Sequence, residues 1–151
     1  MKRAAIAAAL LALAGCGSAA KPSPPALTGP AASCARPSPI AVGKQGPEIT
    51  GRGRGAQLHG LIMAPHFPVS AGRRSVKIVW RMTGSGPLKL AAYDTHGRKV
   101  PLAWIEPHGG SNYRRPGDEW GSGYHFPRPG CYHLTARRTV GSADAWLRVR
   151  A

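Results

Sequence analysis

Glycine and proline interrupt this chain so often that long helices are excluded. The 151 residues include 20 glycines and 15 prolines. Beyond the first 33 residues, no window of eleven or more residues carries a helical stripe of apolar side chains without a glycine or a proline. Because these two residues cost about 1 and about 3 kcal/mol inside a helix, we expect the chain to fold as short strands joined by turns.

Apolar and polar residues alternate within the segments between these breaks. In residues 75–82, Val76, Ile78, Trp80 and Met82 fall on one side of an extended chain, which is the pattern of a half-buried strand. Several such runs at regular spacing predict an all-β protein, folded as a single antiparallel β-sandwich. The expected strands are residues 57–63, 75–82, 88–94, 99–105, 124–126, 131–139 and 143–149, the last two forming a hairpin.

The first residues of the chain have the pattern of an export signal. Lys2 and Arg3 precede an apolar run over residues 4–14, which is too short to span a bilayer as a mature helix. The run leads into the sequence LAGC, which resembles the lipobox of bacterial lipoproteins. The resemblance implies that the chain is cut before Cys16 and that Cys16 carries the lipid. The alternative is an ordinary signal peptide followed by an unrelated cysteine.

These features divide the chain into three parts. Residues 1–15 are expected to be a lipoprotein signal peptide, and residues 16–33 the lipidated cysteine with a flexible tether rich in proline and alanine. Residues 34–151 have the length of one β-sandwich domain. At about 3 Å per residue the tether reaches at most roughly 50 Å. The expected location is the cell membrane, with the domain lipid-anchored on the extracytoplasmic face.

Two cysteines remain once Cys16 is assigned to lipid, Cys34 and Cys131. An even pair in an exported protein predicts a disulfide, which would tie the first residues of the domain to a late strand. A free buried thiol and a pair of metal ligands are the alternatives. Two cysteines so far apart, with no CxxC motif, make a poor metal signature, so the disulfide is favoured.

The later part of the sequence resembles one family of exported proteins. It contains SVKIVWRMTGSGPLKLAAYD, then YHFPRPGCYHLT and a final apolar hairpin, an order similar to that of small bacterial extracytoplasmic lipoproteins of uncharacterised function. The likeness covers residues 75–151 well and residues 34–74 loosely, and Tyr132 stands where tryptophan is commoner. It implies an immunoglobulin-like sandwich in the cell envelope and carries over no catalytic residue. The residues that carry it are Trp80, Arg81, Gly86, Pro87, Leu88, Pro127, Gly130, Cys131 and Tyr132.

The sequence offers little for catalysis. Its six carboxylates include no pair at a spacing that indicates acid–base chemistry, and it has no GxSxG, HExxH or glycine-rich phosphate loop. We therefore expect a non-catalytic protein without a cofactor. One metal alternative is kept: His59, Met63 and His66 lie within the sequence HGLIMAPH, and imidazole and thioether ligands suit copper.

A surplus of basic residues is the strongest feature that the fold does not explain. Without Lys2 and Arg3 the chain keeps 19 basic and 6 acidic residues, a net charge of +13. Such a domain is drawn to anionic lipid or to anionic wall polymers, whereas an exported protein seldom meets nucleic acid. Equally, the arginines could serve only to keep the surface soluble. The basic residues come largely in pairs: Arg52 and Arg54, Arg73 and Arg74, Arg98 and Lys99, Arg114 and Arg115, and Arg137 and Arg138.

Residues 106–123 read as a long loop, which is a common place for recognition on a sandwich. The candidate ligand residues in it are His108, Tyr113, Arg114, Arg115 and Trp120. The first hypothesis is therefore a lipid-anchored, non-catalytic domain that binds an anionic envelope component or an envelope protein. The second is an exported copper-binding lipoprotein. An enzyme is the third.

Overall fold

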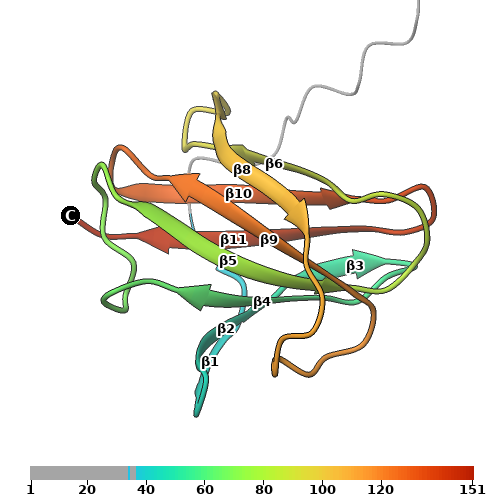
Figure 1. The fold of residues 1–151 in the computed structure, drawn as a ribbon. Coiled ribbons are helices and arrows are strands. Elements are labelled where there is room, and N and C mark those ends of the chain that lie inside the picture. The colour runs from blue at the N-terminus through green and yellow to red at the C-terminus, as the bar shows by residue number, and fades with distance from the viewer. Residues whose placement is uncertain (1–33, 35–36) are drawn as a thin grey trace, which may run out of the picture.

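The described part of the chain is a two-layer antiparallel β-sandwich. The computed structural model describes Cys34 and residues 37–151, and among them it contains strands and no helix (Figure 1). Cys16, the predicted signal peptide (residues 1–15) and the whole predicted tether (residues 16–33) lie outside the described residues. The strands are β1 (Ile40–Gly43), β2 (Gly46–Thr50), β3 (Arg52–Arg54), β4 (Leu58–Met63), β5 (Ser75–Met82), β6 (Lys89–Tyr93), β7 (Lys99–Val100), β8 (Leu102–Pro107), β9 (Asp118–His125), β10 (Gly130–Arg137) and β11 (Ser142–Val149).

The strand order is that of an immunoglobulin-like sandwich, as the sequence predicted. One sheet, here called sheet A, has the order β1-β2-β4-β5-β9-β8, and the other, sheet B, has the order β3-β11-β10-β6-β7. Within these, β4-β5-β9-β8 and β11-β10-β6 repeat the two sheets of the immunoglobulin fold, which are A-B-E-D and G-F-C. Because the chain passes from one sheet to the other several times, each sheet contains strands from both halves of the domain.

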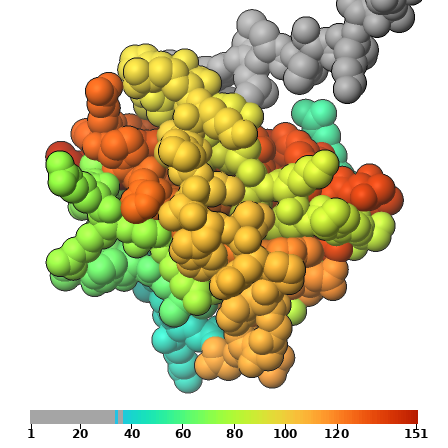
Figure 2. Space-filling view, turned by 45° about the horizontal axis from the view of Figure 1, so that its top comes forward, coloured from blue at the N-terminus to red at the C-terminus, as the bar shows by residue number. Residues whose placement is uncertain are grey.

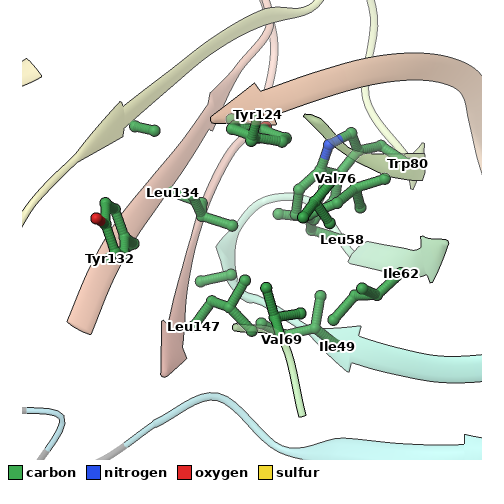
Figure 3. Packing of buried hydrophobic residues seen from close by; sticks show 14 of the residues in the cluster. Ile49, Leu58, Ile62, Val69, Val76, Trp80, Tyr124, Tyr132, Leu134 and Leu147 are labelled. Atoms are coloured by element: carbon green, nitrogen blue, oxygen red, sulfur yellow. The ribbon is translucent and has the colours of Figure 1, made fainter. Parts of the chain in front are cut away.

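The core lies between the two sheets and follows the predicted alternation. Val76, Ile78, Trp80 and Met82 of β5 all point inward and are at most 6 % exposed. Figure 3 shows Trp80 facing Tyr124 from within the same sheet and Leu134 and Leu147 closing the core from the other. All described strands and this cluster fall within residues 37–151, and the domain boundary predicted at residue 34 stays a prediction.

The prediction of one long loop over residues 106–123 was wrong in its second half. Residues 118–125 form β9, which pairs with β5 along its whole length in the middle of sheet A. The glycines that suggested a loop make room for an aromatic ring: a Cβ atom on Gly121 would lie 2.8 Å from Cζ3 of Trp104 in β8, and Gly123 lies against the same indole. These glycines therefore serve side-chain packing across two strands.

The expected strand 99–105 is also two strands. The chain leaves sheet B after β7 at Val100 and enters sheet A with β8 at Leu102, so Pro101 stands where it crosses between the edge strands of the two sheets. A proline has no N–H to donate to a strand partner. Because Pro101 lies between β7 and β8, no neighbouring strand requires a hydrogen-bond donor at this position. The sequence had indicated an edge or a bulge here, and the pairing of β8 with β9 does shift register between Leu102 and Trp104.

Three short strands come before residue 57, where no convincing strand was expected. In β2, only Ile49 is fully buried, and the three residues of β3 are all exposed. Because β1 to β3 lie at the margins of the sheets, they need only backbone pairing and leave almost no apolar alternation in the sequence.

Two contacts fix the start of β10. The disulfide between Cys34 and Cys131 is present, with 5.3 Å between the Cα atoms, and it joins the first described residue to the outer face of sheet B. On the inner face, the Tyr132 hydroxyl donates a hydrogen bond to the carbonyl of Arg128 at 2.8 Å. This bond corresponds to the tyrosine corner of immunoglobulin-like domains, which closes the turn before this strand.

The packing of Trp104 on Gly121 gives a first prediction. Replacing Gly121→Ala pushes a methyl group into the indole, so we expect a loss of about 1–3 kcal/mol in the free energy of unfolding, measured by urea titration. Gly72→Ala is the control, because its added Cβ meets no atom within 4 Å. The double variant Trp104→Ala with Gly121→Ala should lose less stability than the sum of the losses in the two single variants. Losses that add in full would contradict this packing.

The disulfide gives a second prediction. It joins cysteines 97 positions apart, so the double variant Cys34→Ser with Cys131→Ser should lose about 2–5 kcal/mol of stability in urea unfolding. Reductant should lower the stability of the natural chain by a similar amount and leave the double variant unchanged. Equal unfolding midpoints for the oxidised chain and the variant would show that the bond does not hold the fold.

Candidate functional site

The candidate ligand loop shrinks to residues 108–117, and its aromatic residues are buried. Tyr113 is 3 % exposed and packs on Leu61 and Val79, against the outer face of sheet A. Trp120 is 7 % exposed, belongs to β9 and joins the main core. Figure 2 shows the segment containing β8 and the loop, in yellow to orange, across one face of the molecule. Neither aromatic ring is available there to stack on a ligand.

Glu119 ties this loop to the sheet. Its carboxylate accepts hydrogen bonds from Ser111 Oγ at 2.6 Å and from His108 Nδ1, and it forms a salt bridge with Arg81 Nη2 at 2.7 Å. The Glu119 side chain is 2 % exposed. Burial by itself raises the pKa of Glu119, but the hydrogen bonds from Ser111 and His108 and the charge of Arg81 outweigh burial. The pKa of Glu119 therefore lies below its ordinary value.

The order of these bonds differs from that of a nucleophilic triad. In such a triad the histidine stands between the hydroxyl and the carboxylate, whereas here Ser111 and His108 both bond to Glu119, which stands between them. Beside them lies an open hollow of about 590 Å³ that includes Arg81 and Arg138 in its lining. Both guanidiniums are already paired with carboxylates, so the hollow offers no uncompensated cation.

The two arginines of the loop have different surroundings. Arg115 forms a two-pronged contact with Glu48 on β2, with Nε at 2.9 Å from Oε2 and Nη2 at 2.9 Å from Oε1. Arg114 is exposed. Arg115 therefore fastens the loop to the outer face of sheet A. Of the five candidate residues, only Arg114 is exposed and forms no salt bridge with a described residue, since His108 is half-buried and paired with Glu119.

The candidate copper ligands are not gathered in one place. His59 and Met63 lie four residues apart on β4, which at about 3.3 Å per residue separates them by roughly 13 Å. His59 Nδ1 faces Glu48 at 3.7 Å, and Met63 is 51 % exposed on the sheet surface. His66 follows in the β4–β5 loop. Among the described residues no group of three or more His, Cys, Asp or Glu side chains could hold a metal ion.

Most carboxylates of the domain are already neutralised. Within the part of the chain that the structure describes, Glu106 is the single acidic residue that forms no salt bridge. The other five take up five arginines, which are Arg81, Arg98, Arg115, Arg137 and Arg138. The remaining basic residues carry the surplus charge, so their positions decide where an anion is attracted.

Five of those remaining arginines meet at one end of the sandwich. This end, here called the basic end, consists of the β4–β5 loop 64–74, the turns 94–98 and 126–129, and the last residues 148–151. Backbone hydrogen bonds hold it together, from Ala71 N to Arg150 O at 2.8 Å and from Gly72 N to Phe126 O at 2.9 Å. Figure 1 shows the loop, the 126–129 turn and the C-terminus together at the left. The exposed, unbridged arginines are Arg73, Arg74, Arg128, Arg148 and Arg150.

The balance of charge at the basic end is strongly positive. Its single acidic side chain, Asp94, is bound by Arg98, with Nη2 at 2.7 Å. Burial raises the pKa of Asp94, but hydrogen bonds from the Arg98 side chain and backbone and the backbone N–H of His96 lower it further than burial raises it. Asp94 therefore stays ionised and paired, and it leaves the five arginines without a competing acidic partner at this end.

The disulfide brings the start of the domain to the same end. Cys131 is the second residue of β10 and lies directly opposite Arg148 of β11. Arg148 Nη2 donates a hydrogen bond to the carbonyl of Cys34 at 3.2 Å. The domain is therefore joined to the residues before Cys34 beside the arginine cluster.

Sequence reasoning noticed the paired arginines but not this grouping. Arg73 and Arg74 are neighbours in sequence, whereas Arg128, Arg148 and Arg150 come from a turn and from the last strand. Only the pairing of β10 with β11 and the contacts of the β4–β5 loop bring them together. No local signal in the sequence could have identified the group.

Comparisons of the chain with protein-family models, with curated proteins and with solved structures found no match. In the described part of the chain, no helix is long and apolar enough to cross a membrane. Function is therefore inferred from the geometry and charge of the domain itself.

The Glu119 cluster gives a third prediction. Because the pKa of Glu119 is lowered in the folded state, its contribution to stability is full above the unfolded pKa near 4 and is lost as the pH falls through the folded pKa. Glu119→Gln should cost about 2–3 kcal/mol at neutral pH. In urea titrations below about pH 4, the free energy of unfolding of the Glu119→Gln variant should fall less than that of the natural chain, because the variant has no carboxylate to protonate at this position.

Glu106→Gln is the matched control, because Glu106 is exposed and forms no salt bridge with a described residue. It should leave stability and its pH dependence unchanged. If both variants follow the natural chain, Glu119 does not hold the loop.

Proposed function

We propose that this protein is a lipid-anchored, non-catalytic domain on the extracytoplasmic face of a cell membrane, which binds a phosphate-bearing anionic component of the envelope through its basic end. The observation that carries the proposal is the cluster of five exposed arginines with one acidic side chain, itself paired, beside them. Guanidinium groups bind phosphate oxygens in two-pronged geometry, so arginine suits this ligand better than lysine.

The distribution of charge supports this function over simple solubility. A surface kept soluble by charge alone has both signs interspersed. Here arginines and carboxylates do alternate over the sheet faces, where Arg115 meets Glu48 and Arg137 meets Asp144. The basic end departs from that pattern, because its arginines come from three separate segments and the single acidic side chain there, Asp94, is already paired with Arg98.

The proposed anchor supports an envelope partner. A lipid at Cys16 and a tether that ends at Cys34 would keep the domain within roughly 50 Å of the membrane, in a compartment whose abundant polyanions are lipid head groups and wall polymers. Nucleic acid would match the same charge but is scarce there. The copper hypothesis and the enzyme hypothesis stay predictions of the sequence, and no contact among the described residues favours either.

Salt-dependent binding is the fourth prediction. The chain after Cys16, residues 17–151, should bind anionic vesicles or a soluble glycerol-phosphate polymer, with affinity falling as salt rises. Arg73→Gln with Arg74→Gln should weaken binding by about 2 kcal/mol, roughly thirtyfold, since each basic residue near a charged surface contributes about 1 kcal/mol. Co-sedimentation with vesicles and titration calorimetry with the polymer measure the two affinities.

The matched control removes the same charge from the other end of the sandwich. Arg52→Gln with Arg54→Gln alters two exposed arginines of β3, which Figure 1 shows away from the basic end. This variant should bind several times more tightly than the Arg73 and Arg74 variant. Equal losses would mean that net charge alone drives binding, and no binding to either partner at low salt would rule out the proposed function.

A further inference from the structure

We propose that the partner of the basic end is the anionic bilayer surface itself, and that the domain stands end-on to it with Phe67 entering the interfacial region. This inference rests on the proposed function and narrows it, because the envelope anion becomes the phospholipid head group rather than a wall polymer. The observation behind it is an exposed aromatic side chain and an apolar-lined hollow set among the arginines.

Phe67 lies in the β4–β5 loop and is 40 % exposed. Figure 2 shows the green segment that includes this loop projecting at the left margin of the molecule. A polymer of sugar or glycerol phosphates has nothing for a phenyl ring to enter, whereas the boundary between head groups and acyl chains accepts aromatic rings readily. An exposed phenylalanine among arginines is the pairing found at membrane-binding surfaces.

The hollow beside Phe67 has the same mixed character. It has a volume of about 280 Å³, and its lining includes Val69, Val76, Arg73 and Arg74. Both valines are buried, and both arginines are exposed. A hollow with an apolar floor and guanidinium groups in its wall fits a lipid, whose glycerol and first methylenes are apolar and whose phosphate is anionic.

The arginines and Phe67 fit the bilayer at different depths. Arg128 and Arg150 lie next to the β4–β5 loop. The carbonyl of Arg150 accepts a hydrogen bond from Ala71 N, and the carbonyl of Phe126, two residues before Arg128, accepts one from Gly72 N. With the loop tip in the interface, these side chains lie level with the phosphates, and their long stems can extend to keep the charge there.

The position of Cys34 suits this orientation. The tether would join the domain beside Arg148, at the end that faces the bilayer. Anchoring makes surface contact an intramolecular step with an effective concentration in the millimolar range, so a weak contact is enough to orient the domain. The opposite end, with the hollow beside Glu119 and His108, then faces away from the membrane.

The fifth prediction separates lipid from polymer. Residues 17–151 should bind vesicles of phosphatidylglycerol and phosphatidylcholine in about equal parts, and bind pure phosphatidylcholine weakly. Phe67→Ser should weaken binding to the anionic vesicles about fivefold, and it should leave binding to the soluble glycerol-phosphate polymer unchanged. Val140→Ser is the control, because Val140 is 58 % exposed in the turn between β10 and β11, at the other end of the sandwich.

Each outcome decides the proposal. Vesicle binding that falls in Phe67→Ser and not in Val140→Ser supports it. Vesicle binding that Phe67→Ser leaves unchanged overturns it, because charge alone then accounts for the contact. Binding to the polymer without binding to vesicles also overturns it but leaves the proposed function intact, whereas binding to neither removes both. Circular dichroism of each variant checks that it is folded.

Discussion

The rest of the structure depends on burying the inner faces of the two sheets against each other. Trp80 lies at the centre of this contact, fully buried, with its indole N–H donating to Ser122 Oγ at 2.9 Å and Ser122 donating in turn to the carbonyl of Ile78. The polar groups of Trp80 and Ser122 are thereby satisfied, so the large ring can be buried without leaving its N–H unpaired. The remaining inner positions are apolar and belong to strands of both sheets.

This arrangement leaves the faces and the ends of the sandwich to the charged residues. On the faces, carboxylates and arginines meet in pairs. Glu119, paired with Arg81 across two strands, holds the loop through Ser111 and His108, and Glu48 holds it through Arg115. Because the acidic residues are few and almost all paired, the surplus arginines cannot be compensated. The fold then decides where they gather, and it gathers five of them at the end where Cys34 joins β10.

The candidate site was therefore only partly predictable. The fold class, the disulfide and the core face of β5 followed from the sequence, since alternation and cysteine count are visible residue by residue. The ligand loop did not: glycines 121 and 123 looked like loop residues because the sequence does not reveal that Trp104 packs over them from a neighbouring strand. Tyr113 and Trp120 looked accessible for the same reason, and each proved to be packed against apolar residues of sheet A or of the core.

The sequence by itself determined that the chain makes short strands, that its core face carries Trp80 and that its charge is strongly basic. These properties are local, because a strand alternates with period two whatever its partner and net charge is a sum over residues. Only the tertiary structure decided which arginines remain without a carboxylate and that Arg73, Arg74, Arg128, Arg148 and Arg150 share one end. Those neighbours are set by pairing between distant strands and by one disulfide across 97 positions, and neither can be read from adjacent residues.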